Sequence, residues 1–327
     1  MKTFNNPSVT AKLKAMYAKK LKKDDLDDLI KQEHIKDAII ILKSKIDDLD
    51  NLSNDAKRLE LENSLDKLII IDMKKIDKYI NGTILTHCLN MFIFICEKYI
   101  LKYKIDIIKK IYEKVITNEL QNIENTIWVT NIFTDLEPLL KVKSKEEFLE
   151  QLPDEDIKEI FETSKNNFEL ENNLNKYYFE GFLHEVKGKN KDIETVLKYS
   201  IDLLNIFWTY RCQKYYGIVD ENILINSFYK IDINIIREVE KIETIEELKQ
   251  ILSHTAYKNI IKEDVQKDVK RALYKRSKSS FRKDILNLNT VISYFEMIQI
   301  EKENIITIIE GIRYNLKGPT IKNKIII

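Results

Sequence analysis

The sequence contains few residues that interrupt helices. Its 327 residues include only 6 glycines and 4 prolines, well below the average usage of either residue. Alternation of apolar and polar residues, the signature of a half-buried strand, is never sustained between turn residues. Apolar residues recur instead at spacings of three and four, which is typical of amphipathic helices. We therefore expect an all-α fold.

Motifs for catalysis and for cofactor binding are also lacking. The sequence has no glycine-rich phosphate-binding loop and no Gly-x-Ser-x-Gly nucleophile motif. Its histidines are His34, His87, His184 and His254, and none is spaced from a second ligand as metal sites require. His87 adjoins Cys88, but neighbouring side chains on a helix point to different sides. We predict no catalytic residue, no cofactor and no metal.

The sequence also has few cysteines, a net charge near zero and no long apolar run. The three cysteines, Cys88, Cys96 and Cys212, are not closely paired and no signal peptide precedes them, which indicates a reducing compartment. The 54 basic and 53 acidic residues nearly cancel, so no overall field attracts nucleic acid or an anionic membrane. The longest apolar runs are much shorter than the roughly 20 residues that span a bilayer. We expect a cytoplasmic protein that does not bind nucleic acid.

One stretch, Lys267–Lys283, is locally basic. It could form a docking surface for an acidic partner, a phosphate group or lipid headgroups. The alternative is a solvated helix face whose apolar side chains, Leu273, Tyr274 and Phe281, belong to the core. The sequence leaves both interpretations open.

A helical sequence pattern occurs three times along the chain. Thr244 and Glu247 have the spacing of a capping box, and an apolar stripe follows them. The pattern recurs about 100 residues earlier and again about 110 residues before that, each time behind a leading helix. A chance alignment of helical segments is the alternative. We predict three repeat domains, at 1–90, 91–202 and 203–327. The matching columns hold Thr244, Glu247, Leu248 and Leu252; Ser144, Glu147, Phe148 and Leu152; and Asp37, Ala38 and Leu42.

Three regions, in this order, resemble the C subunit of V-type rotary ATPases, whose eukaryotic form is called the d subunit. The first is AKLKAMYAKKLKKDDLDDLIKQEHIKDAIIILK, and the second runs from YYFEGFLHEVKG to IETIEELKQILSHTAY. The third is similar to the closing helix of the family, with its run E-x-x-N-I followed by I-x-x-G-x-x-x-x-L. Residues 46–85 and 110–135 match poorly. The positions of the closing run are Glu301, Asn304, Ile305, Ile308, Gly311 and Leu316.

The sequence departs from the family pattern at several charged positions. Lys12 and Lys14 stand where arginines are usual, which keeps the charge but loses the guanidinium fork. Ile298 and Gln299 replace a usual Lys-Glu pair, and Glu303 replaces a common arginine. Salt bridges of the family at these positions are therefore not expected here.

The resemblance implies a funnel-shaped, all-helical protein with three similar domains around a pseudo-threefold axis. It implies a non-catalytic rotor component of a V-type ATPase or ATP synthase, peripheral on the cytoplasmic face of the membrane. Its partners would be the D and F subunits of the central stalk and the proteolipid (c/K) ring, with membrane contact only through that ring. The protein would transmit torque for coupled ion or proton transport. The alternative is a free-standing helical scaffold that binds protein partners. The candidate partner contacts are Lys12, Lys14, Lys19, Tyr210, Arg211, Lys214, Glu301, Asn304, Arg313 and Tyr314.

Overall fold

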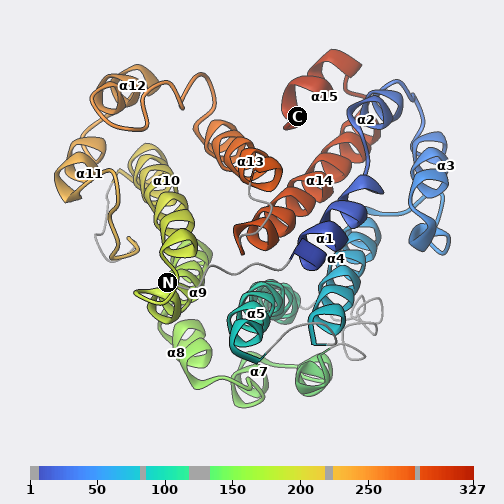
Figure 1. The fold of residues 1–327 in the computed structure, drawn as a ribbon, viewed down its shortest axis with the longest axis horizontal. Helices are drawn as coiled ribbons and strands as arrows, with labels where there is room; N and C mark the ends of the chain where they lie inside the picture. Colours follow the sequence, from blue (N-terminus) through green and yellow to red (C-terminus); the bar gives the residue numbers. More distant parts are fainter. Residues whose placement is uncertain (1–6, 82–85, 118–132, 218–223, 284–287) are drawn as a thin grey trace. The chain divides into compact units, whose positions relative to one another are not determined.

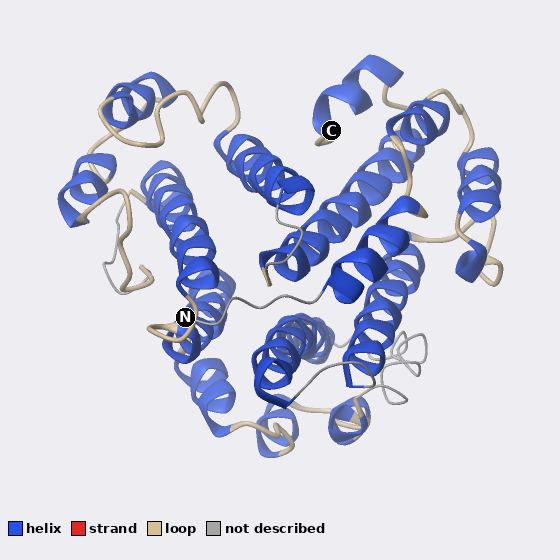
Figure 2. Ribbon diagram, viewed as in Figure 1, coloured by secondary structure: helices blue, strands red, loops and turns tan. Residues whose placement is uncertain are grey.

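The protein is helical throughout the part of the chain that the structure describes. The computed structural model describes residues 7–81, 86–117, 133–217, 224–283 and 288–327, and its regular elements there are all helices (Figures 1 and 2). This confirms the all-α prediction. The chain forms two compact units, one of Met1–Ile100 with Leu273–Ile327 and one of Leu101–Ala272. The division into three repeat domains stays a prediction.

The first unit is built around the long helix α14, Asn289–Arg313. The first half of α14 is buried on almost every side, as expected of a helix that is apolar all round. Helices α1, α2, α3, α4 and α15 all pack against it. The other elements of this unit are α1 (Pro7–Ala18), α2 (Lys23–Ile30), α3 (Ile35–Lys45), η1 (Asp47–Leu49), α4 (Arg58–Asn81), the start of α5 (Thr86–Ile116), the end of α13 (Val265–Lys283) and α15 (Gly318–Lys324).

Helix α15 packs against α14 at Gly311, where there is no room for a side chain. A Cβ atom at Gly311 would lie 2.7 Å from Cγ1 and 2.9 Å from Cδ1 of Ile321. Ile321 is itself only 1% exposed, so its side chain is confined by the core. A glycine inside a helix costs about 1 kcal/mol relative to alanine. The close approach of the two helices explains why glycine stands here.

We expect the effect of Gly311→Ala on the free energy of unfolding to depend on the residue at position 321: destabilising with isoleucine there, stabilising with alanine. In the native background the extra methyl overpacks the core, at a cost of about 1–3 kcal/mol that exceeds the gain in helix propensity. In an Ile321→Ala background the clashing atoms are gone, and Gly311→Ala should then stabilise the protein. Urea unfolding of the four proteins of this double-mutant cycle measures both effects. The same sign in both backgrounds would contradict the packing argument.

The second unit has its own core, in which aromatic side chains from three helices meet. Tyr112 of α5 lies between Phe148 and Phe161, with ring centroids 5.2 Å and 4.8 Å away. The phenylalanine rings are 5.3 Å apart and edge-to-face, a favoured aromatic geometry. The elements of this unit are the rest of α5, η3 (Thr134–Leu136), η4 (Pro138–Leu140), α7 (Lys145–Glu150), α8 (Glu155–Thr163), α9 (Asn167–Val186), α10 (Lys191–Tyr216), α11 (Ile233–Val239), α12 (Ile245–Ser253) and the start of α13.

The local helix signals of the second unit are present as predicted. Ser144 and Thr244 cap α7 and α12 by accepting hydrogen bonds from the backbone N–H groups of Glu147 and Glu247. The sequence Tyr215-Tyr216-Gly217 predicts the end of a helix, because glycine adopts the left-handed closing conformation at little cost. Helix α10 does end at Gly217, whose φ is +67°. The predicted apolar columns, Phe148, Leu152, Leu248 and Leu252, are all buried.

Several expected helix boundaries in the first unit were wrong. Asp24 stands just before an apolar stripe, where an aspartate favours a helix N-cap. It does not cap α2, because the helix starts earlier and Asp25 accepts a hydrogen bond of 2.8 Å from the N–H of Lys22. The polar run DDLDNLSNDAKRLELEN favours a helix that starts nearer Leu68. Helix α4 begins earlier, at Arg58, because Leu61 and Leu65 extend the buried stripe toward the N-terminus by about two turns. The apolar pattern favours a helix from about Leu85 to Tyr103, but α5 runs on to Ile116. We also predict that Trp128 lies in or near a helix before Pro138, but this residue is outside the described part of the chain.

The basic stretch forms most of α13. Its apolar residue Phe281 is buried, with its ring 5.2 Å from that of Tyr17. Lys275, Arg282 and Lys283 are exposed on the same helix. This arrangement favours the interpretation of a solvated face beside a core stripe.

Candidate functional site

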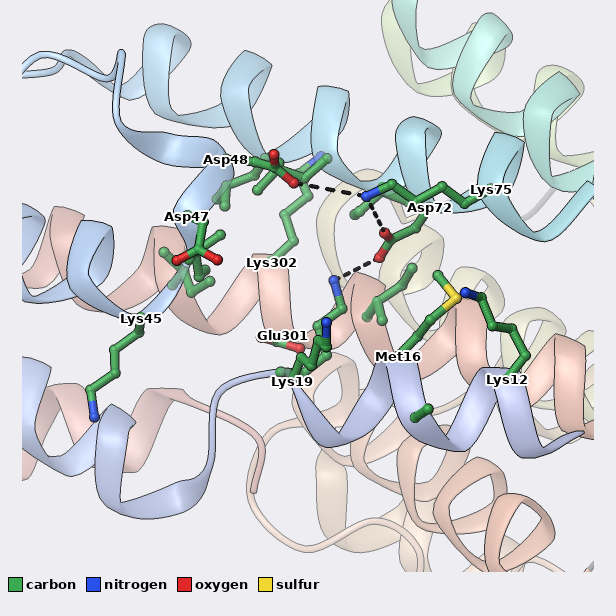
Figure 3. Close-up of a pocket in the computed structure, with 18 residues that line it drawn as sticks. Lys12, Met16, Lys19, Lys45, Asp47, Asp48, Asp72, Lys75, Glu301 and Lys302 are labelled. Atoms are coloured by element: carbon green, nitrogen blue, oxygen red, sulfur yellow. Dashed lines mark hydrogen bonds and ion pairs between the residues drawn. The ribbon is translucent and has the colours of Figure 1, made fainter. Parts of the chain in front are cut away.

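A pocket of about 520 Å³ lies in the first unit, between α1, α4, α14 and the end of α3 (Figure 3). Its wall combines an apolar part from α4 and α14 with many charged side chains. Charges of both signs line it, so it does not present a field of one sign. The charged residues are Lys12, Lys19, Lys20, Lys45, Lys75 and Lys302 with Asp47, Asp48, Asp72 and Glu301.

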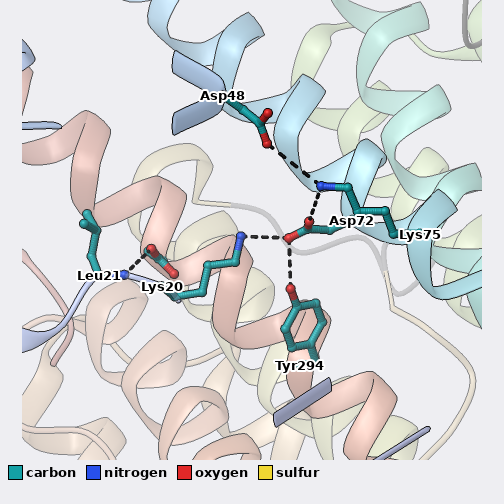
Figure 4. Close-up of polar contacts among 7 residues, drawn as sticks. Lys20, Leu21, Asp48, Asp72, Lys75 and Tyr294 are labelled. Atoms are coloured by element: carbon teal, nitrogen blue, oxygen red, sulfur yellow. Dashed lines mark hydrogen bonds and ion pairs between the residues drawn. The ribbon is translucent and has the colours of Figure 1, made fainter. Parts of the chain in front are cut away.

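Asp72 is the centre of an ion network in this pocket (Figure 4). Its Oδ2 lies 2.7 Å from Nζ of Lys20 and accepts a hydrogen bond of 2.9 Å from the hydroxyl of Tyr294. Nζ of Lys75 lies 3.9 Å from Asp72 and 3.9 Å from Asp48. Burial and the Asp72 carboxylate both raise the pKa of Tyr294, so its hydroxyl stays a donor. The network joins α4, α14 and the segment after α1.

Glu301 lies beside this network and is held by the main chain. Its Oε1 accepts a hydrogen bond of 3.0 Å from the N–H of Leu21, in the link between α1 and α2. Burial raises the pKa of Glu301 to about 7, the carboxylates of Asp72 and Asp25 add to this, and Lys20 opposes it. Glu301 is half-buried in the pocket wall, and a partly desolvated carboxyl group with few donors is poorly stabilised in its charged form.

Asn304, one turn further along α14, forms hydrogen bonds to the segment that follows α15. Its Nδ2 donates to the carbonyl of Ile326 at 2.6 Å, and its Oδ1 accepts from the N–H of the same residue at 2.8 Å. Asn304 is buried. The side chain therefore satisfies the main-chain groups of one residue inside the protein.

The same pair of contacts occurs in α10 of the second unit. The side chain of Asn205 donates to the carbonyl of Ile225 and accepts from its N–H, both at 3.0 Å. Asp202 stands where Glu301 stands, three residues before the asparagine, and it also accepts backbone N–H groups. Residues 202–206 and 301–305 thus share an acid-x-x-Asn-Ile pattern with a common structural role. A comparison of the closing-helix run with DLLNI would have found it in the sequence.

The candidate contacts of α10 gather at the C-terminal end of this helix. Tyr210 is only 6% exposed. Nζ of Lys214 lies 3.4 Å from the Tyr210 hydroxyl, and the guanidinium of Arg211 lies over the ring of Phe168 at 5.5 Å. These three residues belong to the second unit and are close together.

The remaining candidate contacts belong to the first unit. Lys12 is exposed, with its Nζ 5.7 Å from the centre of the Tyr79 ring, and Lys19 is exposed at the pocket. Lys14 is half-buried. Arg313 donates to the carbonyl of Ala56 at 2.6 Å and to Glu310 at 2.9 Å, whereas Tyr314 is exposed. Lys12, Lys19 and Glu301 therefore share the pocket, and Arg313 is committed to internal bonds.

The described residues offer little for chemistry. His34, His184 and His254 are exposed, and no three of the described His, Cys, Asp or Glu side chains are grouped as metal ligands. In the same part of the chain, no helix combines the length and apolarity that a membrane span requires. The site is a network of structural hydrogen bonds and ion pairs.

The sequence model of the ATP synthase (C/AC39) subunit family matches residues 9–324, almost the whole chain. The chain belongs to this family. The match confirms the resemblance to the V-type ATPase family that the three regions indicated. A comparison with curated proteins gave no match.

Proposed function

We propose that this chain is a non-catalytic component of the central rotor of a V-type ATPase or ATP synthase. It would join the D and F subunits of the central stalk to the proteolipid ring on the cytoplasmic face of the membrane, and transmit torque between them. The observation that carries the proposal is the family match over residues 9–324.

The packing within each unit suits a part that transmits force. Long helices such as α10 and α14 are surrounded by close-packed side chains, and close-packed interiors resist compression and pass on strain. Loop segments are tied to these helices by the asparagine contacts to Ile225 and Ile326. A torque applied to one segment would therefore be carried by the whole unit.

The exposed lysines of α1 and its C-terminal end are proposed as contacts with a partner protein. Lys12 and Lys19 are exposed beside the pocket, and Lys14 lies on the same helix as Lys12. Exposed charges at the edge of an interface act mainly on the rate and salt dependence of association. Their removal should weaken binding to the complex while leaving the fold intact.

The test is a pull-down of the tagged protein from detergent-solubilised membranes of its own cells, with mass spectrometry. We expect stalk and proteolipid proteins in near-equal amounts, and a recovery that falls several-fold at moderate salt in a Lys12→Gln, Lys14→Gln, Lys19→Gln variant. A Lys36→Gln, Lys57→Gln, Lys67→Gln variant is the control, because it removes the same charge from exposed positions of the same unit. Recovery of neither kind of partner with the native protein would favour the free-standing scaffold.

A further inference from the structure

The C-terminal end of α10 presents aromatic side chains to solvent. Tyr215 is 69% exposed and Tyr216 is 56% exposed, whereas large aromatic residues are usually well buried. The ring of Tyr216 packs on Phe168 of α9, with centroids 5.0 Å apart. We call Phe168, Arg211, Lys214, Tyr215 and Tyr216 the α10-end surface.

The two cations of this surface are held in place by rings. The guanidinium of Arg211 lies 5.5 Å from the centre of the Phe168 ring. Nζ of Lys214 lies 5.6 Å from the Tyr210 ring and 5.8 Å from the Tyr215 ring. Stacking on a ring leaves the edge N–H groups of a guanidinium available as donors. The surface is thus ordered before any partner binds, which lowers the entropy lost on association.

Neither cation forms an ion pair with a carboxylate among the described residues. Many other basic side chains of the chain do, for example Lys20 with Asp72 and Lys198 with Glu194. The helix dipole favours a lysine in the last turn, which accounts for Lys214 alone. The dipole does not explain why Arg211 stacks on Phe168, nor why two tyrosines of the same surface are exposed.

We propose that the α10-end surface binds a carboxylate-bearing segment of a neighbouring protein in the complex. The inference rests on the proposed function, because it places that neighbour in the rotary complex. Tyrosine and arginine are among the residues most enriched at binding hot spots, and the guanidinium fork matches a carboxylate with two parallel hydrogen bonds. Lipid headgroups fit less well, because membrane recruitment by charge takes clusters of about four to eight basic residues.

The test uses membranes from cells that lack the gene for this chain, with the full-length purified protein added back. Binding of the native protein is compared with that of a Tyr215→Ser, Tyr216→Ser variant and an Arg211→Gln, Lys214→Gln variant. We expect each variant to lose roughly tenfold or more in affinity. A benzophenone photo-crosslinker at position 216 should label a stalk or ring protein within a segment that contains Asp or Glu.

A Tyr229→Ser, Lys230→Gln variant is the matched control. Tyr229 is an exposed tyrosine of the same unit with Nζ of Lys230 4.7 Å from its ring, and both residues donate their backbone N–H groups to Asp202. Since the substitutions keep these backbone bonds, the variant should bind like the native protein. A circular-dichroism melt establishes that all variants are folded.

The possible results separate the two proposals. If the native protein does not bind these membranes, the proposed function and this inference both fail. If it binds and both α10-end variants bind equally well, only this inference fails. Binding to phosphatidylglycerol vesicles with the same losses would assign the surface to lipid and overturn the inference. A further test combines an Asp220→Asn, Glu221→Gln variant with the Arg211→Gln, Lys214→Gln variant. If their effects on the melting temperature are not additive, the cations bind the chain's own acidic residues, and the inference is overturned.

Discussion

Replacing Asp202 by alanine is expected to lower the free energy of unfolding by about 4 kcal/mol. The carboxylate is completely buried. It accepts hydrogen bonds from the N–H groups of Tyr229 at 3.0 Å and Lys230 at 2.7 Å, and from the hydroxyl of Tyr257 at 2.6 Å. Burial raises its pKa, and these donors oppose that rise. The alanine variant would leave three donors without this acceptor, and each such buried group costs about 1–3 kcal/mol.

The substitution Asp202→Asn separates the loss of hydrogen bonds from the loss of volume. The amide oxygen of the asparagine can accept some of the three hydrogen bonds, but its NH₂ group would face one of the three donors and cannot accept from it. We expect a loss between that of alanine and the native protein, measured by urea unfolding with the same m-value. Ser253→Ala, at an exposed position of the same unit, should change stability by less than about 0.5 kcal/mol. A loss below about 1 kcal/mol for Asp202→Ala would show that the three contacts do not hold the second unit together.

Replacing Glu301 by glutamine is expected to stabilise the protein at high pH and to have little effect at low pH. Burial raises the pKa of Glu301 from 4.5 to about 7, so the folded protein binds this proton more tightly than the unfolded chain does. The native protein therefore loses stability as the pH rises from about 4.5 to about 7, and keeps the full stability only below that range. Each pKa unit corresponds to 1.36 kcal/mol, which gives a difference of up to about 3 kcal/mol.

The measurement is the free energy of unfolding of both proteins at about pH 5 and about pH 8. Glutamine still accepts a hydrogen bond from the N–H of Leu21, so the contact at 3.0 Å is kept. Glu33→Gln is the control, because Glu33 is exposed, and its effect should be the same at both pH values. A difference between the native protein and Glu301→Gln that does not change with pH would refute the expectation.

These two acids occupy the same position of a repeated pattern, and burial raises the pKa of both, but they receive different numbers of hydrogen bonds. Asp202 receives three donors, whereas the described contacts of Glu301 include one backbone donor, from Leu21. A buried carboxylate is tolerated when its hydrogen bonds replace the lost hydration. Because more donors hold Asp202, we expect its loss to cost more stability than the loss of the Glu301 carboxylate.

The amino-acid sequence by itself determined the fold class, many helix ends and the family. The scarcity of glycine and proline and the spacing of apolar residues predicted helices, and Thr244 with Glu247 and Gly217 marked ends that the structure confirms. These signals act over about one helical turn, because a cap bonds to a backbone group only a few residues away. The order of three similar regions identified the family, which needs no knowledge of contacts.

Only the tertiary structure decided which residues far apart in the sequence come into contact and how exposed to solvent each of them is. Asp72 joins Lys20 and Tyr294, and Asn304 fastens Ile326, across long stretches of sequence. The raised pKa of Glu301 follows from burial by several helices, and no local window of sequence records desolvation. Asn304 and Tyr210, expected as partner contacts, proved to be buried. The sequence defines which side chains a helix carries, and the packing of helices decides which of them reach solvent.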